Sequence, residues 1–489
     1  MSLRRSPFRR RATVALVALA AIALAPFTPR PLLAHTRLTS SDPASGAEIK
    51  TSPAFVRLTF NEAPTPAFSS IELAGSAGAV ALGPLMADPA SALTLVALVP
   101  ARLAPGRYTV RWRAAAKDGH PTQGSFTFSI VATLKSASTA VTPPATPPIT
   151  PAPSSAPSPS AQPVPPPSPA PPPSATPADA SSLAYTVIRF VMYASTIGLI
   201  GCALFVLLLL RRLRSLGLGS DLFAEDAAAA ARRIAAVCAT VLLLATPARL
   251  LAQSMILSAS MPTILGELWG RAWVLQAAGS LVALAAVRSA RGIAVARWRM
   301  AGVGAIAVAA GFALTGHAAA MPSYAPLVEL ADVVHLVAAG AWVGTLGAVA
   351  LAGIPAALRT PESVRGATAA SLVNAFSPLA LFSAAVLAIT GAFAAWEHLG
   401  GLQPLFSSAY GRTLLIKLGT VAVVAAIGAV NWRLPRPQLG SEPAARGIRR
   451  SALRELAVAA VVIAVTAVLV ATPTPGDAPA APVSSAPVP

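Results

Sequence analysis

From residue 183 to residue 472 the chain alternates long apolar runs with short polar loops. A helix that crosses the hydrocarbon core of a bilayer needs roughly 20 apolar residues, and each run is close to that length. The runs that meet this requirement are 184–210, 229–255, 269–287, 300–317, 328–352, 371–396, 411–431 and 453–472. The pattern therefore predicts an all-α, polytopic membrane domain of about eight transmembrane helices over 182–472.

A different pattern precedes these runs. Over 35–134, short segments alternate apolar and polar residues, which is typical of strands buried on one face. The clearest such segments are 56–60, 108–112 and 125–130. Turn residues such as Asp42-Pro43 and Pro105-Gly106 separate them. Short strands spread over roughly 100 residues predict a β-sandwich or barrel.

Three further segments are neither strand-like nor long enough to span a membrane. Residues 1–34 combine arginines near the start with an apolar stretch over 12–25, as secretory leaders do, and cleavage after Ala34 would make His35 the first residue. Residues 135–181 are almost wholly Pro, Ser, Ala and Thr, which predicts an extended, disordered linker. The Pro- and Ala-rich tail 473–489 is expected to be disordered as well.

Composition supports the membrane assignment and narrows the function. The chain is 55% hydrophobic and 11% charged. Its net charge of +19 is typical of proteins that bind nucleic acid. The arginines, however, cluster in short loops and form no basic stripe interleaved with aromatic residues. Nucleic acid binding is therefore excluded. Cys202 and Cys238 both lie inside apolar runs, so we expect them to be packing residues and not members of a disulfide framework.

The arginines also orient the helices. Loops 256–268, 318–327 and 397–410 contain no Lys or Arg, whereas the alternate loops hold most of the arginines of this region. By the positive-inside rule the arginine-rich loops are cytoplasmic. We therefore expect a multi-pass protein of the cytoplasmic (inner) membrane, with its N-terminal domain and C-terminal tail on the periplasmic or extracellular side.

The chain has only five histidines, and two of them fall in the predicted β domain. A free N-terminal His35 could chelate a metal through its α-amine and its ring. Asp118 and His120, within one Asp-Gly-His turn, could add a carboxylate and a second imidazole. Such a square-planar set of nitrogen and oxygen ligands suits Cu(II). We interpret His35, Asp118 and His120 as a Cu(II) site.

The β domain resembles the CopC copper-binding proteins. The resemblance rests on the opening His35-Thr36-Arg37-Leu38 with 41–47, on Phe60-Asn61-Glu62-Ala63-Pro64, and on 112–128 around Asp118-Gly119-His120-Pro121. It implies an immunoglobulin-like β-sandwich that binds Cu(II) through the N-terminal His and the Asp-x-His pair. We interpret Glu62 of the second motif as a solvated surface carboxylate, with an outer-sphere group of the copper site as the alternative.

Ionisable and thioether side chains mark a second candidate metal site, which lies in the membrane domain. Ionisable groups inside spans are costly and are by default candidates for function. His317 ends one run, His335 lies inside the next with Asp332 three residues before it, and His398 ends another. Imidazole and thioether ligands suit copper. The candidate path comprises His317, His335, His398, Met255, Met261 and Met321.

This half resembles the CopD membrane family. The resemblance rests on Gly316-His317-Ala318-Ala319, on 332–336 with Trp342-Val343-Gly344, and on 410–417, and it covers about 183–472. It implies copper entry into the cytoplasm or copper handling at the membrane, with Cu(I) or Cu(II) as the ion. Tyr410, Arg412 and Lys417 are interpreted as structural residues that reach the outer interface.

The favoured function is therefore a non-enzymatic copper importer that captures Cu(II) outside and passes it to a transmembrane domain. Extracytoplasmic copper chaperones or cuproproteins are candidate partners, beside the copper ion and the lipid bilayer. The chain contains no P-loop motif of the form GxxxxGK[ST]. Three alternatives stay open: a haem-binding protein with His317 and His335 as axial ligands, a copper-sensing or resistance protein that transports nothing, and a copper-dependent oxidative enzyme.

Overall fold

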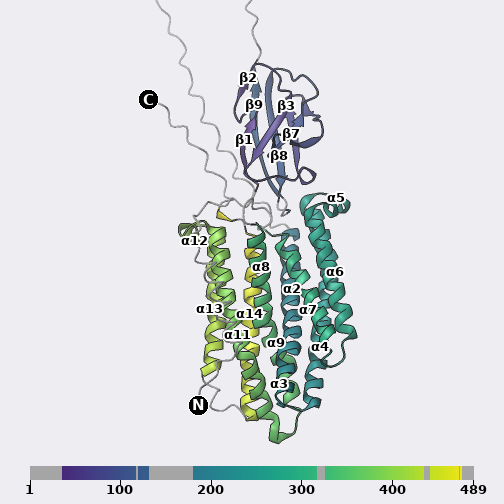
Figure 1. The fold of residues 1–489 in the computed structure, drawn as a ribbon. Coiled ribbons are helices and arrows are strands. Elements are labelled where there is room, and N and C mark those ends of the chain that lie inside the picture. The colour runs from purple at the N-terminus through teal and green to yellow at the C-terminus, as the bar shows by residue number, and fades with distance from the viewer. Residues whose placement is uncertain are drawn as a thin grey trace, which may run out of the picture.

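The computed structural model describes residues 36–116, 119, 121–131, 180–316, 325–433, 441–472 and 474–475. A β domain stands over one end of a long helical bundle (Figure 1). The predicted leader, almost all of the predicted linker and nearly the whole tail lie outside the described residues. The linker's last two residues, Ala180 and Ser181, already belong to the first helix of the bundle.

The β domain is a sandwich of two sheets. One sheet has the order β1-β3-β7-β6 and the other the order β2-β9-β8-β4-β5. The strands are β1 (Leu38–Asp42), β2 (Glu48–Ile49), β3 (Phe55–Phe60), β4 (Ser70–Gly75), β5 (Gly78–Val80), β6 (Leu85–Asp88), β7 (Ser91–Leu98), β8 (Gly106–Ala115) and β9 (Pro121–Ile130). The predicted β-sandwich is thus confirmed, and the three predicted strands correspond to β3, β8 and β9.

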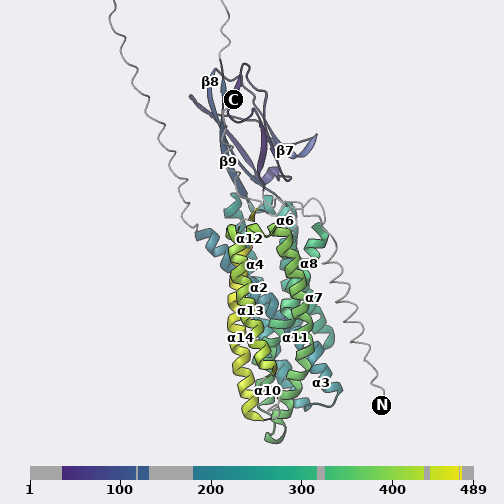
Figure 2. The same ribbon diagram turned by 90° about the vertical axis from the view of Figure 1, so that its left-hand side faces the viewer.

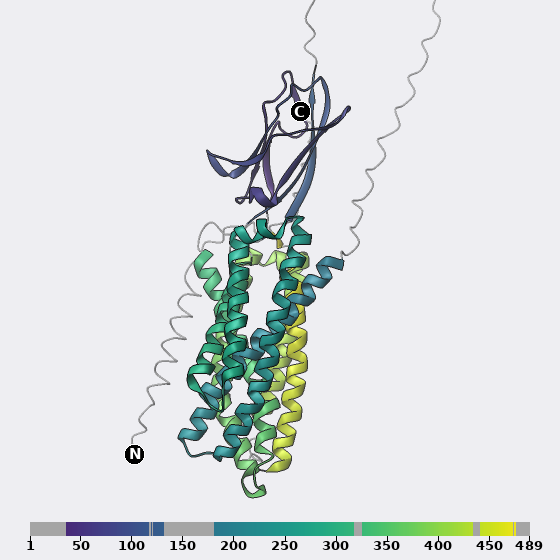
Figure 3. The same cartoon turned by 90° about the vertical axis from the view of Figure 1, so that its right-hand side faces the viewer.

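The sandwich core follows from the alternation along these strands. Val56, Leu58 and Phe60 of β3 are buried, whereas the residues between them are not. In the antiparallel β8–β9 hairpin Tyr108 lies opposite Phe128, and their rings stack with centroids 5.5 Å apart. The two long strands point from the sandwich toward the helices (Figures 2 and 3). The end of the hairpin at the Ala115–Pro121 pair is therefore nearest to the bundle.

The membrane domain is entirely helical. Its first half comprises α2 (Ala180–Leu204), the π-helical η2 (Phe205–Leu210), α3 (Arg211–Ser215), α4 (Asp221–Leu257), α5 (Met261–Gly266), α6 (Leu268–Ser289) and α7 (Val295–Ala313). Its second half comprises α8 (Ala325–Ala339), η4 (Gly340–Gly344), α9 (Thr345–Ala348), η5 (Val349–Gly353), α10 (Ile354–Ala357), α11 (Glu362–Leu399), α12 (Gln403–Ser407), α13 (Ala409–Arg433) and α14 (Glu442–Leu469).

Seven stretches of these helices are long and apolar enough to cross a bilayer. They coincide with seven of the eight predicted runs, and most extend beyond the apolar run because charged residues continue the helix at its ends. The remaining run, 300–317, corresponds to α7, which packs along α6 and α2. Arg297 and Arg299 occupy the first turns of α7, so its apolar part is shorter than that of the other helices.

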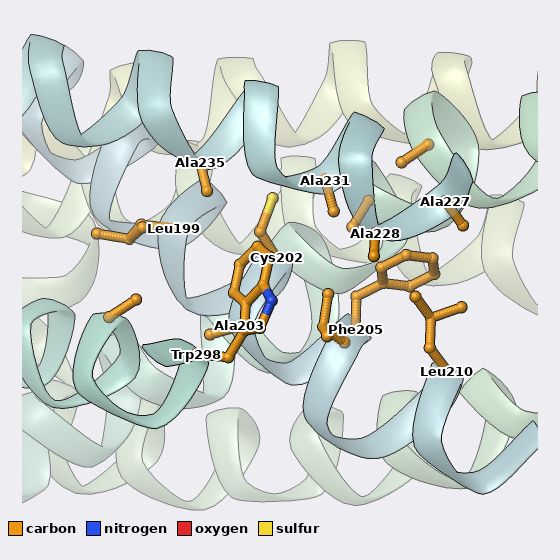
Figure 4. Packing of buried hydrophobic residues seen from close by; sticks show 14 of the residues in the cluster. Leu199, Cys202, Ala203, Phe205, Leu210, Ala227, Ala228, Ala231, Ala235 and Trp298 are labelled. Carbon is orange, nitrogen blue, oxygen red and sulfur yellow. The ribbon is translucent and has the colours of Figure 1, made fainter. Parts of the chain in front are cut away.

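Small residues allow the helices to pack closely. Figure 4 shows Ala227, Ala228, Ala231 and Ala235 of α4 directed toward α2, with the Trp298 ring of α7 beside Cys202. Both cysteines are free thiols, as expected for packing residues.

A glycine pair brings two helical segments into direct backbone contact. A Cβ on Gly344 of η4 would lie 2.0 Å from the Ile197 carbonyl oxygen of α2. A Cβ on Gly201 would lie 1.9 Å from the Gly344 carbonyl carbon. Small residues at such crossings let transmembrane helices approach until their backbones touch. This contact joins the two halves of the membrane domain.

The two ends of the bundle differ in charge. α5 and α12 lie at the end that carries the β domain, whereas α3 and α10 lie at the opposite end (Figures 1 and 2). Ion pairs gather at that opposite end, including Arg359 with Asp226 at 3.1 Å and Arg365 with Glu442 at 3.1 Å. The arginine-rich loops and the β domain are therefore at opposite ends, as the charge pattern of the sequence predicts.

Candidate metal centre

The predicted Cu(II) ligands His35, Asp118 and His120 lie outside the described residues. The residues that flank them are described, and they meet. Thr122 donates a hydrogen bond from Oγ1 to the Thr36 carbonyl oxygen at 2.5 Å. Thr36 directly follows the first predicted ligand, and Thr122 is two residues beyond the last. The fold thus joins the two chain segments on which the predicted site depends.

Glu62 lies at the same junction, and its predicted exposure was wrong. The side chain is 3% exposed, and the Thr36 hydroxyl donates to Oε1 at 3.0 Å. The neighbouring Asn61 side chain accepts a hydrogen bond from the Arg37 backbone at 2.5 Å. The loop after β3 therefore turns inward and binds the start of the described chain, so the Glu62 carboxylate is a buried structural partner of Thr36.

The β8–β9 turn contacts the membrane domain at the outer end of α4. Gly119, the central residue of the Asp-Gly-His motif, accepts a hydrogen bond on its carbonyl oxygen from Gln253 Nε2 at 2.8 Å. Arg113 of β8 donates to Ser258 Oγ at 3.1 Å and to the Ile256 carbonyl oxygen. Gly119, which lies between the predicted ligands Asp118 and His120 in the sequence, is therefore held next to α4.

Beneath this contact the bundle holds a buried polar cluster that the sequence interpretation missed. Arg249 of α4 is 2% exposed. It donates hydrogen bonds to Gln276 Oε1 at 2.5 Å, to Thr315 Oγ1 at 2.8 Å and to Tyr185 Oη at 3.3 Å. A basic residue inside an apolar run was the available signal, because such a charge needs dedicated partners within the membrane.

His335 lies between α8 and α11, where it is half-buried. Its Nδ1 is 2.8 Å from Thr390 Oγ1, and that hydroxyl also lies 2.8 Å from the Val386 carbonyl oxygen one turn earlier. Hydroxyls on helices commonly donate to the carbonyl four residues before them. With the Thr390 proton used in this way, His335 donates from Nδ1, and its Nε2 is the unprotonated nitrogen that can bind a metal.

Other polar groups of α8, α11 and α13 surround His335. Asp332 interacts electrostatically with His398 and Lys417, and His335 also interacts with Lys417. The His398 ring stacks on Tyr410 with centroids 5.9 Å apart. Tyr410 is buried, and Lys417 faces charged groups of the bundle. Both residues therefore belong to this polar cluster, and the interpretation of them as structural residues that reach the outer interface stays a prediction.

Two of the predicted thioether ligands, Met255 and Met261, do not join the cluster around His335. Met255 is 62% exposed on α4 and Met261 is 40% exposed at the start of α5. His317 and Met321 lie outside the described residues. Within the part of the chain that the structure describes, no three His, Cys, Asp or Glu side chains form a group that could hold a metal ion.

Comparison with known proteins finds copper-related families in both the β domain and the membrane domain. The CopC domain family matches residues 38–131, the copper resistance protein D-like N-terminal domain matches 179–325, and copper resistance protein D matches 370–469. Copper transport protein CutJ of Bacillus subtilis (strain 168) is 25% identical over 476 residues, covering 92% of this chain and 76% of that protein.

Shorter relatives match the β domain alone. Copper resistance protein C of Pseudomonas syringae pv. tomato is 34% identical over 103 residues, which cover 20% of this chain and 81% of that protein. Among solved structures, CopC from Methylosinus trichosporium OB3b is 31% identical and covers 20% of this chain and 93% of its own, with a TM-score of 0.19. The chain belongs to the copper resistance and transport family in which a CopC domain and a CopD membrane domain are joined in one polypeptide.

Proposed function

We propose that this protein captures Cu(II) outside the cytoplasmic membrane with its CopC domain and passes it to its membrane domain for copper import and homeostasis. The proposed ligands are the amine and ring of a mature N-terminal His35, together with Asp118 and His120. The observation that carries the proposal is the hydrogen bond between Thr122 and Thr36. This bond joins the two ligand-bearing segments, and two such segments are required to complete a Cu(II) site of this kind.

The proposed receiving station in the membrane is His335. Its Nδ1 is held by Thr390, which leaves Nε2 as a metal-competent nitrogen. Asp332, three residues before it on α8, is a carboxyl group that in its ionised form favours a nearby cation. His317 and His398 are proposed as further stations, and copper can be Cu(I) or Cu(II) there. Met255, Met261 and Met321 remain candidates for the outer entrance.

The orientation is part of the proposal. The β domain and the tail are on the periplasmic or extracellular side of the cytoplasmic membrane, because the arginine-rich loops lie at the other end of the bundle. Extracytoplasmic copper chaperones or cuproproteins are the proposed donors of copper. The protein is proposed to act without catalysing a chemical reaction.

Capture is tested by Cu(II) binding to the purified full-length protein. N-terminal sequencing is expected to show His35 as the first residue. His120→Ala is expected to weaken Cu(II) binding at least about tenfold, since even outer ligands of metal sites contribute that much. Arg107→Ala is a matched control, because this exposed side chain of β8 donates to Thr127 and is no part of the proposed site. Wild-type Cu(II) affinity in His120→Ala would contradict the proposed site.

Transfer is tested by copper accumulation in cells. His335→Ala is expected to lower accumulation and to leave Cu(II) binding at the CopC-domain site of the full-length protein unchanged, because the two sites lie in different domains. Leu330→Ala, at an exposed position of the same helix, serves as the control. Unchanged accumulation in His335→Ala would remove the proposed role of this histidine.

A further inference from the structure

The outer ends of α4, α5 and α6 form a surface that fits the β domain. Phe68 and Ala115 of the β domain share one buried apolar cluster with Leu250, Leu257, Ile264 and Trp269 of the bundle. Beside this cluster, Gln253 donates its hydrogen bond to the Gly119 carbonyl oxygen. We call the five bundle residues Leu250, Gln253, Leu257, Ile264 and Trp269 the turn-docking surface.

Gly119 fits this surface because it has no side chain. Its φ of +74° lies in the left-handed region that favours glycine. A Cβ built on Gly119 would lie 2.6 Å from Gln253 Nε2 and 3.3 Å from Trp269 Cδ1. Any other residue would therefore strain the turn and push it away from α4 and α6. The contact is specific for a glycine at the centre of the Asp-Gly-His turn.

The turn-docking surface rests on the buried Arg249 cluster. The Arg249 guanidinium lies 5.0 Å from the centre of the Trp269 ring, and Arg249 is one helical turn before Gln253. Its hydrogen bonds to Tyr185, Gln276 and Thr315 tie this point to α2, to α6 and to the segment that follows α7. Few of these groups can move independently, so the surface is presented to the turn in a fixed position.

The charge of Arg249 also limits what this surface can do. A buried guanidinium strongly disfavours a second cation nearby, because electrostatic repulsion is poorly screened inside a bilayer. An ion carried by the β8–β9 turn is therefore not expected to continue downward between α2, α4 and α6. The surface therefore holds the domain. The proposed His335 station, where Asp332 lies opposite the Lys417 charge, belongs to the other half of the bundle.

From this geometry we propose that the turn-docking surface is an intramolecular receptor for the β8–β9 turn. Gln253 is its positioning residue, because it holds the carbonyl group between the two proposed ligands Asp118 and His120. The receptor fixes where on the membrane domain the β domain delivers its ion. This role rests on the proposed function, whereas docking itself does not require copper.

Docking can be measured by cross-linking across a cavity beside the contact. The cavity has a volume of about 240 Å³, and Ala63 of the β domain and Leu268 of α6 lie on its two sides. We would introduce Ala63→Cys and Leu268→Cys in full-length protein with Cys202→Ala and Cys238→Ala. The rate of cross-linking by a short bifunctional maleimide, in membranes and without copper, reports the docked population.

Loss of the receptor contact should slow cross-linking. Gln253→Leu removes one hydrogen bond and is expected to lower the rate about threefold to tenfold. Gly119→Ala is expected to lower it about tenfold, from backbone strain and the clash with Gln253. In a Gln253→Ala background Gly119→Ala should have a smaller effect, because the atom that clashes is gone. Leu251→Ala, at an exposed position of α4, should cross-link like the wild type.

Two results would overturn the receptor. One is a wild-type cross-linking rate in both Gln253→Leu and Gly119→Ala. The other is a Gly119→Ala effect of equal size with and without the Gln253 side chain. Since Gln253 and Gly119 belong to different domains, misfolding of one domain cannot explain the expected pair of losses. A chain that docks normally but accumulates no copper would contradict the proposed function and leave the receptor intact.

Discussion

Thr390→Val removes the group that orients His335 and keeps the shape of the side chain nearly unchanged. The lost contact is the 2.8 Å hydrogen bond between Thr390 Oγ1 and His335 Nδ1. Without it the Nδ1 proton has no partner at this position, and the imidazole can rotate or exchange its tautomer. Loss of such an outer partner typically weakens metal binding about tenfold to a hundredfold, which equals about 1.4 to 2.7 kcal/mol.

The assay is copper affinity of the purified full-length protein, measured by competition with a chromogenic chelator. His120→Ala is included in every variant so that the proposed Cu(II) site of the β domain does not dominate the measured copper affinity. Cu(I) and Cu(II) are measured separately. The expected result is an affinity that falls by the factor given above, with little change in the thermal unfolding midpoint.

Ser383→Ala provides the matched control for Thr390→Val. Ser383 is a buried hydroxyl on the same helix, and it donates to the Leu379 carbonyl oxygen at 2.8 Å. Its removal should leave copper affinity unchanged. Equal losses in Ser383→Ala and Thr390→Val would refute an orienting role for Thr390, and so would an unchanged affinity in Thr390→Val.

Two further substitutions test the packing that supports these sites. Gly344→Ala should lower the unfolding midpoint in detergent by the equivalent of about 1–3 kcal/mol, because its Cβ would collide with α2. Gly347→Ala, whose Cβ would have its closest neighbour at 3.7 Å, should not, and equal effects would refute the close-contact argument. Glu62→Ala should destabilise the β domain by about 1–3 kcal/mol, since the buried Thr36 hydroxyl loses its acceptor. A wild-type unfolding midpoint for this variant would show that the carboxylate has no structural role.

The sequence predicted the elements of both domains because each follows from a local pattern. Alternation over 56–60 reports a strand buried on one face, and that strand is β3. Runs of apolar residues report helices long enough for a bilayer, and the predicted 371–396 lies inside α11. α7 is the one predicted span that is less apolar than the others, because Arg297 and Arg299 lie within its first turns.

Features that depend on distant contacts were not predicted. Glu62 looks like a surface carboxylate in the sequence, and only the fold brings it against Thr36, 26 positions away. The contact between Gln253 and Gly119 joins residues 134 positions apart in different domains. Lys417 was interpreted from its place near a helix end, whereas its electrostatic interaction with Asp332 of another helix arises only in the fold. Local patterns carry no information about such pairs.

The central claim is that copper taken from outside crosses the membrane through this chain. Its most direct test is uptake of radioactive copper by cells with and without the protein, supplied as Cu(II) from outside. The account predicts faster uptake with the wild-type protein and loss of that gain in either His120→Ala or His335→Ala. Equal uptake with and without the protein, or a wild-type gain in both variants, would contradict it.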